Sequence, residues 1–139
     1  AETGHLILAT LHTQDTTHAI NRVVDVFPPD QQSQVYVQLS MVLVGVISQQ
    51  LLMTKDKTRR VLACEVMSVN NAIRNLVREM QVQQIYSVIE TGASEGMMTM
   101  NSSLAELFHA GLITEEKAMR RSPRPKELVR LLNAKHRKK

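Results

Sequence analysis

The stretch "LILATLHTQD" (Leu6–Asp15) sets the expected fold, because an apolar run of strand length ends there at a histidine. A continuous run of four to eight apolar residues is typical of a strand covered on both faces, as in parallel sheets. Residues 6–11 are therefore predicted to form a buried strand, with His12 at its carboxyl end.

A helix is predicted directly after this strand. Its apolar positions repeat with helical spacing, at Ala19, Ile20, Val23, Val24 and Phe27. Asp15 or a neighbouring threonine can cap its start, and the Pro28–Pro29 pair is expected to end it. A strand, a turn and a helix make half of a βαβ unit, which indicates an α/β fold.

The middle of the chain gives one ambiguous signal and one clear signal. Asp30–Leu52 is rich in β-branched residues but also keeps a helical phase, and its length without a turn signal favours a buried helix. The following stretch, "LLMTKDKTRRVLACEVM" (residues 51–67), has two apolar arms around a polar turn at Lys55–Arg60. This pattern predicts a β-hairpin.

From Ala72 onward the pattern is helical. Two helices are expected to meet near Gln81, and Gly92 is expected to end the second of them. A capping box at Ser103 and Glu106 begins a short helix that Gly111 ends, and Thr114 is the N-cap of the next helix. The last helix follows Pro125 and turns Leu128, Leu131 and Leu132 toward the core. We therefore divide the chain into residues 1–70, with the strand, helix and hairpin, and residues 71–139, a small helical bundle.

Composition narrows the class of protein. The 139 residues carry a net charge of +4, much of it in the tail "NAKHRKK" (residues 133–139), and only 3% are aromatic. Because stacking platforms are scarce, the tail is interpreted as a solvated end, and nucleic-acid binding is the weakest reading. The single cysteine, Cys64, excludes a disulfide framework and favours the cytoplasm.

Two further features concern processing and membranes. The longest apolar stretch, residues 35–52, is interrupted by Gln38, Ser40 and Ser48, so a soluble chain is expected. The chain starts at Ala1, and "AETGHL" resembles a helix end with Gly4 as the left-handed cap residue. We therefore expect an internal or C-terminal fragment of a longer protein.

His12 is the strongest candidate for chemistry, because ligands of α/β sheets bind at the carboxyl ends of the strands. The residues alone still favour a structural role for His12. No metal site is predicted, since His5 and His12 lie at opposite ends of one expected strand and the other histidines lack ligand spacing. No G-x-x-x-x-G-K-[ST] phosphate loop occurs in the chain. Glu65 is read as a half-buried ion-pair partner without a role.

Four motifs occur in the order typical of one family. They are "AETGHLILATLHT" (residues 1–13), "AIRNLVRE" (72–79), "IYSVIETG" (85–92) and "GMMTMNSSLAELFHAGLI" (96–113). Together, over residues 1–121, the chain resembles the C-terminal part of the PilT-type type IV pilus retraction ATPases, members of the secretion ATPase superfamily. The resemblance implies an α/β fold: the C-terminal part of a RecA-like P-loop ATPase core followed by a small all-helical bundle.

The resemblance also implies roles for named residues. "TLHT" corresponds to the histidine box, which places His12 near the nucleotide γ-phosphate as a sensor and makes Thr13 a candidate nucleotide contact. Such a histidine loses its partner on hydrolysis, and this differential contact can drive a conformational change. The retraction motif comprises Ala72, Ile73, Arg74, Asn75 and Leu76. Arg74 and Asn75, otherwise a solvated helix face, are then expected to form a functional surface.

The implied parent protein is a homohexameric motor that uses ATP and Mg²⁺ to drive pilus retraction and twitching motility. It would lie in the cytoplasm at the inner face of the cytoplasmic membrane, peripheral to it, against the type IV pilus inner-membrane machinery. The fragment itself lacks the Walker motifs and is expected neither to bind the cofactors nor to hydrolyse ATP. The alternative reading is a non-enzymatic helical protein-interaction module.

Overall fold

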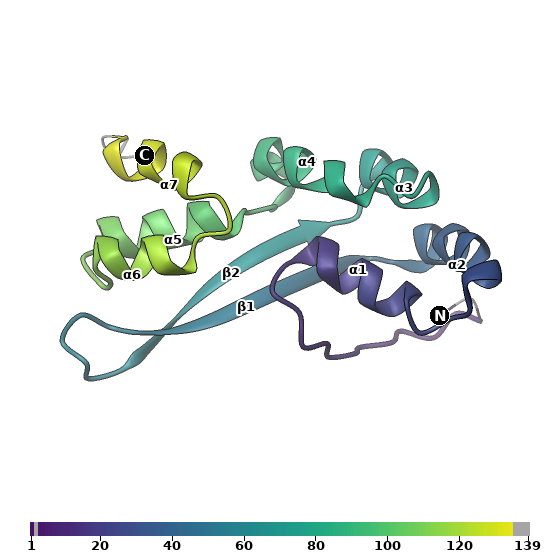
Figure 1. The fold of residues 1–139 in the computed structure, drawn as a ribbon, viewed down its shortest axis with the longest axis horizontal. Helices are drawn as coiled ribbons and strands as arrows, with labels where there is room; N and C mark the ends of the chain where they lie inside the picture. The colour runs from purple at the N-terminus through teal and green to yellow at the C-terminus, as the bar shows by residue number, and fades with distance from the viewer. Residues whose placement is uncertain (2, 135–139) are drawn as a thin grey trace.

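The computed structural model describes residues 1 and 3–134, and the basic tail from residue 135 onward lies outside them. Figure 1 shows a long antiparallel hairpin of two strands, β1 (Gly45–Met53) and β2 (Arg60–Ser68), with helices gathered along it. The helices are α1 (Thr16–Val24), α2 (Pro29–Val42), α3 (Asn71–Arg78), α4 (Ile85–Thr91), α5 (Met100–His109), α6 (Glu115–Arg121) and α7 (Pro125–Asn133), with 3-10 turns η1 (Val82–Gln84) and η2 (Ala93–Glu95). The mixed α/β class is confirmed.

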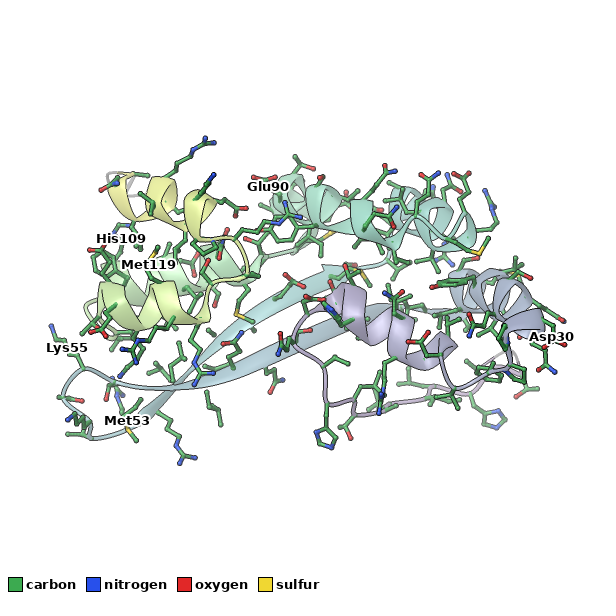
Figure 2. The ribbon with its side chains drawn as sticks, viewed as in Figure 1. Asp30, Met53, Lys55, Glu90, His109 and Met119 are labelled. Atoms are coloured by element: carbon green, nitrogen blue, oxygen red, sulfur yellow. The ribbon has the colours of Figure 1, made fainter. Side chains whose placement is uncertain are left out.

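The hairpin and its turn lie where the sequence predicted them. The two strands pair over nine positions, from Gly45 opposite Ser68 to Met53 opposite Arg60. The turn is held by hydrogen bonds of its own residues, since the backbone N–H of Thr54 donates to the carbonyl oxygen of Arg59 at 2.9 Å. Figure 2 shows Met53 and Lys55 at this end of the hairpin, far from Asp30 at the start of α2.

The predicted helix over Asp30–Leu52 is wrong in its second half. Helix α2 ends at Val42, and β1 begins at Gly45. A Cβ atom at Gly45 would lie only 2.9 Å from the carbonyl oxygen of Met67, so the strands approach closely where glycine permits it. The residues that follow pair along the whole of β2, and this long-range ladder overrides their helical phase.

The predicted strand over residues 6–11 is also wrong, because residues 5–13 form neither helix nor strand. Leu6 and Leu8 are 80% and 88% exposed. A strand needs a neighbour for its backbone hydrogen bonds, and within the described residues the sheet comprises β1 and β2, with one isolated bridge from Val66 to Met98. The expected buried strand therefore has nothing here to pair with or to cover it.

Three helix ends follow the predicted local signals, and the start of α5 does not. Asp15 caps α1 and Thr114 caps α6, and Gly92 ends α4, as predicted. The exception is α5, whose N-cap is Thr99, which accepts from the backbone N–H of Ser102 at 3.1 Å. The predicted capping box at Ser103 is therefore wrong.

Other details of the helical part also differ from the expectation. The hydroxyl of Ser103 instead accepts from the backbone N–H of Cys64 at 3.0 Å, which ties α5 to β2. Helix α1 ends at Val24, four residues before the prolines, and Pro29 begins α2. Long-range packing and a better cap decide these boundaries, which local signals alone misplace.

Two hydrophobic cores fill the space between the hairpin and the helices. The first comprises Ile20, Met67, Ile73, Val77, Val82, Ile85, Ile89 and Met97. The second comprises Leu52, Ala63, Met100, Leu104, Ala105, Ile113, Ala118 and Leu128. Both cores take residues from either side of position 70, and the division into residues 1–70 and 71–139 stays a prediction.

The hairpin turn makes stability depend on pH in the acid range. Hydrogen bonds from the Thr54 hydroxyl, and then from the Thr58 backbone and hydroxyl, lower the pKa of Asp56 from 3.8 to about 2. A carboxylate with a lowered pKa stabilises the fold above its unfolded pKa, and this contribution is lost as the pH falls through its folded pKa. The stabilisation from Asp56 is therefore expected to disappear between about pH 4 and pH 2.

Asp56→Asn should lower the urea midpoint of unfolding at pH 6, and the gap from wild type should close as the pH falls to 2. Thr58→Val, which removes one donor to the carboxylate, is expected to lie between the two. A gap that stays constant over this range would contradict the role assigned to Asp56.

Candidate functional site

The candidate site lies where the extended N-terminal segment turns into α1. His12 is exposed and Thr13 is partly exposed, and neither makes a hydrogen bond within the described residues. Two residues further on, Asp15 accepts from the backbone N–H of His18 at 2.8 Å and contacts the Nδ1 atom of its ring at the same distance. Among the described residues, positions 6–14 thus make no hydrogen bond, and hydrogen bonding resumes at Asp15, where α1 begins.

Glu65 of β2 holds the first residue of α1, a contact that the sequence did not predict. Its Oε1 atom accepts from the backbone N–H of Thr16 at 3.0 Å and from the Thr16 hydroxyl at 2.8 Å. Glu65 and Thr16 are each 1% exposed, and no basic residue pairs with Glu65 among the described residues. The predicted half-buried ion pair is therefore wrong, and Glu65 is a fully buried acceptor.

A signal for this contact was present in the sequence. Ala63, Glu65 and Met67 alternate along β2 on the face that is buried. A carboxylate on a buried face needs hydrogen-bond donors from another element. The period of the strand therefore indicated that Glu65 has a buried partner, although it could not say which.

Two cavities flank the residues before α1. One, of about 250 Å³, is lined by residues that include Asp15, His18, Glu65 and Arg124. The other, of about 360 Å³, is lined by residues that include Thr13, Gln14, Gln50 and Arg121. The structure thus places Thr13 beside the C-terminal end of α6, whereas His12 lines neither cavity.

The five residues of the predicted retraction motif divide between the core and the surface of α3. Ile73 is fully buried and Leu76 is partly buried against the same core, whereas Ala72 and Asn75 are exposed. The motif is therefore one turn of an amphipathic helix with two residues facing inward.

Arg74 contacts the neighbouring helix instead of lying free on the surface. Its Nη1 atom donates to the carbonyl oxygens of Ser40 and Met41, at 2.9 and 3.0 Å. Both carbonyls lie in the last turn of α2, where the helix leaves backbone acceptors unpaired and where positive charge is favourable. Arg78, by contrast, is exposed and donates to Asn75 at 2.8 Å.

A polar cluster fixes α7 against α4 near the first cavity. The hydroxyl of Tyr86 donates to the carboxylate of Glu127 at 2.7 Å, and the Arg124 guanidinium lies 3.6 Å from the centre of the Tyr86 ring. Burial and this hydrogen bond raise the pKa of Tyr86 well above its ordinary value. Tyr86 is therefore a structural donor rather than an acid or base near neutral pH.

Comparisons with known proteins assign most of the chain to one protein family. The family model of the type II/IV secretion system protein matches residues 1–127. The chain belongs to this family.

Two curated relatives specify the branch of the type II/IV secretion system family that this chain resembles. A twitching motility protein of Neisseria gonorrhoeae is 48% identical over 88% of the chain and 33% of its own length. The type IV pilus retraction ATPase PilT of Pseudomonas aeruginosa is 47% identical over 90% of the chain and 36% of its own length. The chain thus spans about a third of the relatives that it matches.

Solved structures support the same assignment of the fold. The pilus retraction motor PilT with bound ADP superposes with a TM-score of 0.82 at 50% identity, over 94% of this chain and 36% of that one. The ATPase DotB of Legionella pneumophila has a TM-score of 0.70 at 24% identity, over 85% and 32%, and this likeness concerns the fold alone. The predicted resemblance to PilT-type secretion ATPases is confirmed.

The residues present suit a nucleotide only in part. The His12 ring and the Thr13 hydroxyl offer hydrogen-bond donors to phosphate oxygens, and both are accessible.

Among the described residues no three His, Cys, Asp or Glu side chains come together as a cation site. Nor does any helix in that part of the chain have the length and apolarity to cross a bilayer.

Proposed function

We propose that this chain is part of a motor ATPase that hydrolyses ATP to retract type IV pili. The observation that carries the proposal is the match over 94% of the chain, at 50% identity, to a pilus retraction motor solved with ADP. The twitching motility relative, at 48% identity, supports the same biological process. We also propose that the parent protein is a homohexamer, that it uses Mg²⁺ with ATP, and that it lies at the inner face of the cytoplasmic membrane beside the pilus machinery.

Within that motor, His12 is proposed to sense the γ-phosphate. Its exposure and its lack of hydrogen bonds among the described residues leave the imidazole available to a ligand. An imidazole that bonds to ATP but not to ADP would bind the two states with different affinity. Only such a difference can shift a conformational equilibrium, and this supports a sensor rather than a general base.

The exposed residues of α3 are proposed to contact the pilus machinery. Ala72 and Asn75 face solvent, and the Arg78 side chain extends this surface through its hydrogen bond to Asn75. Ile73 and Leu76 face the core and support the surface from below. Of the five residues in the motif, the proposed contact surface therefore includes Ala72 and Asn75.

The test compares ATP hydrolysis by the 139-residue chain and by the full-length protein that contains it. The full-length protein is expected to turn over ATP, and the chain, which has no phosphate loop, is not. Robust turnover by the chain alone would overturn the expected inactivity of the fragment. A full-length protein that binds pilus components without hydrolysing ATP would instead support the helical interaction module.

A further inference from the structure

The buried carboxylate of Glu65 does more than the start of a helix requires. Asp15 already caps the first turn of α1 through the backbone N–H of His18. The bonds from Thr16 to Glu65 are additional, and they join residues 49 positions apart in the sequence. Their distinctive effect is therefore to tie the start of α1 to the hairpin.

The hydrogen bonds between Thr16 and Glu65 lie just after the histidine box in the sequence. Residues 6–14 make no hydrogen bond within the described chain, so Thr16 is the first residue after His12 that is bonded to the sheet. Thr16 lies four positions after His12, and a fully extended chain covers at most roughly 14 Å over that length. The position of Thr16 thus bounds the region that the His12 ring can reach.

The chemistry of the contact between Glu65 and Thr16 makes it strong. Both residues are excluded from water, where a charge-assisted hydrogen bond is strong. A negative charge is also favourable at the N-terminus of a helix, where backbone N–H groups are unpaired. Thr16 is therefore held beside Glu65 through both its backbone and its side chain.

The second oxygen of Glu65 carries a cost that helix stability alone does not explain. Its Oε2 atom is buried and has no hydrogen-bond partner among the described residues. A buried acceptor left unpaired is unfavourable, and such groups in native proteins call for a functional or structural reason. Oε2 belongs to the same carboxylate that lines the cavity beside Asp15 and His18.

We propose that Glu65 is a positioning residue for the histidine box. By holding Thr16 on the hairpin, Glu65 sets the position from which His12 contacts the nucleotide. This inference rests on the proposed ATPase function. It adds a residue from the hairpin to a site otherwise described by the N-terminal segment. It also couples the two, because any shift of β2 against α1 moves the base of the loop that carries His12.

The experiment measures steady-state ATP hydrolysis by the full-length protein with Glu65→Ala, Glu65→Gln and Thr16→Val. Glu65→Ala is expected to lower kcat by about tenfold with little change in KM for ATP, since a small misplacement of a catalytic group reduces turnover. Glu65→Gln keeps an oxygen that accepts from Thr16 and should restore most of kcat. Thr16→Val removes only the hydroxyl donor and should have an intermediate effect.

Amide hydrogen exchange supplies a readout that needs no nucleotide. In Glu65→Ala, the peptide covering residues 12–20 should exchange faster than in wild type, whereas Glu65→Gln should retain most of the protection. Thr99→Ala is the matched control, because Thr99 is a buried threonine at the start of a helix, as Thr16 is, but the helix is α5. It should lower Tm without changing kcat or the exchange of residues 12–20.

The outcomes separate this inference from the proposed function. An inactive wild-type protein would overturn both. An active wild type with Glu65→Ala and Thr16→Val at wild-type kcat, and with unchanged exchange of residues 12–20, would overturn the positioning role alone. If Glu65→Ala fails to fold, wild-type kcat and wild-type exchange in Thr16→Val overturn it equally.

Discussion

Replacing His12 by alanine in the full-length protein is expected to lower ATP turnover by about a hundredfold or more. Removing one preorganised hydrogen-bond donor from a developing negative charge typically costs this much. The fold should be unaffected, because the His12 side chain is exposed and bonds to nothing in the described chain. Steady-state kcat and the thermal unfolding midpoint, measured on the same preparation, check both parts.

His5→Ala is the matched control for this variant. His5 lies in the same extended segment and is also exposed, with one contact to the hydroxyl of Thr3. It should hydrolyse ATP at the wild-type rate. If His12→Ala also hydrolyses ATP at the wild-type rate, the sensor role is excluded.

The second large effect separates the buried half of the retraction motif from its exposed half. Ile73→Ala is expected to lower the free energy of unfolding by about 2–5 kcal/mol, because Ile73 is 0% exposed and lies within the first core. Asn75→Ala should change it by less than about 0.5 kcal/mol, as is usual for surface substitutions. Urea unfolding followed by circular dichroism measures both values.

Pilus retraction is expected to depend on the exposed residue Asn75, although replacing this residue leaves the stability of the protein almost unchanged. Asn75→Ala is expected to reduce twitching motility while the protein accumulates at its normal level, since its exposed side chain is proposed to face the pilus machinery. Normal motility in a stable Asn75→Ala protein would remove Asn75 from the proposed surface. An Ile73→Ala protein of wild-type stability would show that the packing around α3 has been misassigned.

Local chemistry explains which parts of the fold were predictable. Asp15 and Thr114 cap helices because their side chains reach backbone donors three residues away, and the polar turn at Lys55–Arg60 separates two apolar arms. The apolar runs were harder to interpret. Residues 45–52 have a helical phase but pair with β2, and residues 6–11 have strand character but no neighbour. In both cases the partner, not the segment, decides the structure.

The candidate site was predictable to a similar degree. The histidine box stays a prediction from its motif, and the structure leaves the His12 side chain exposed, as the proposed role requires. The contact between Glu65 and Thr16 could not be predicted, because hydrogen bonds across 49 positions depend on how the hairpin packs against α1. Arg74 shows the same limit, since its helical phase did not indicate that the last turn of α2 lies within reach.

The contact of Arg74 with α2 has a mechanical consequence. The last turn of α2 leads within three residues into β1 at Gly45, so the arginine joins α3 to the start of the hairpin. To slide α3 along α2, both charge-assisted hydrogen bonds must break at once, which resists shear between the helices. A load applied at the exposed face of α3 therefore reaches the strands through a short and stiff path rather than through the loops alone.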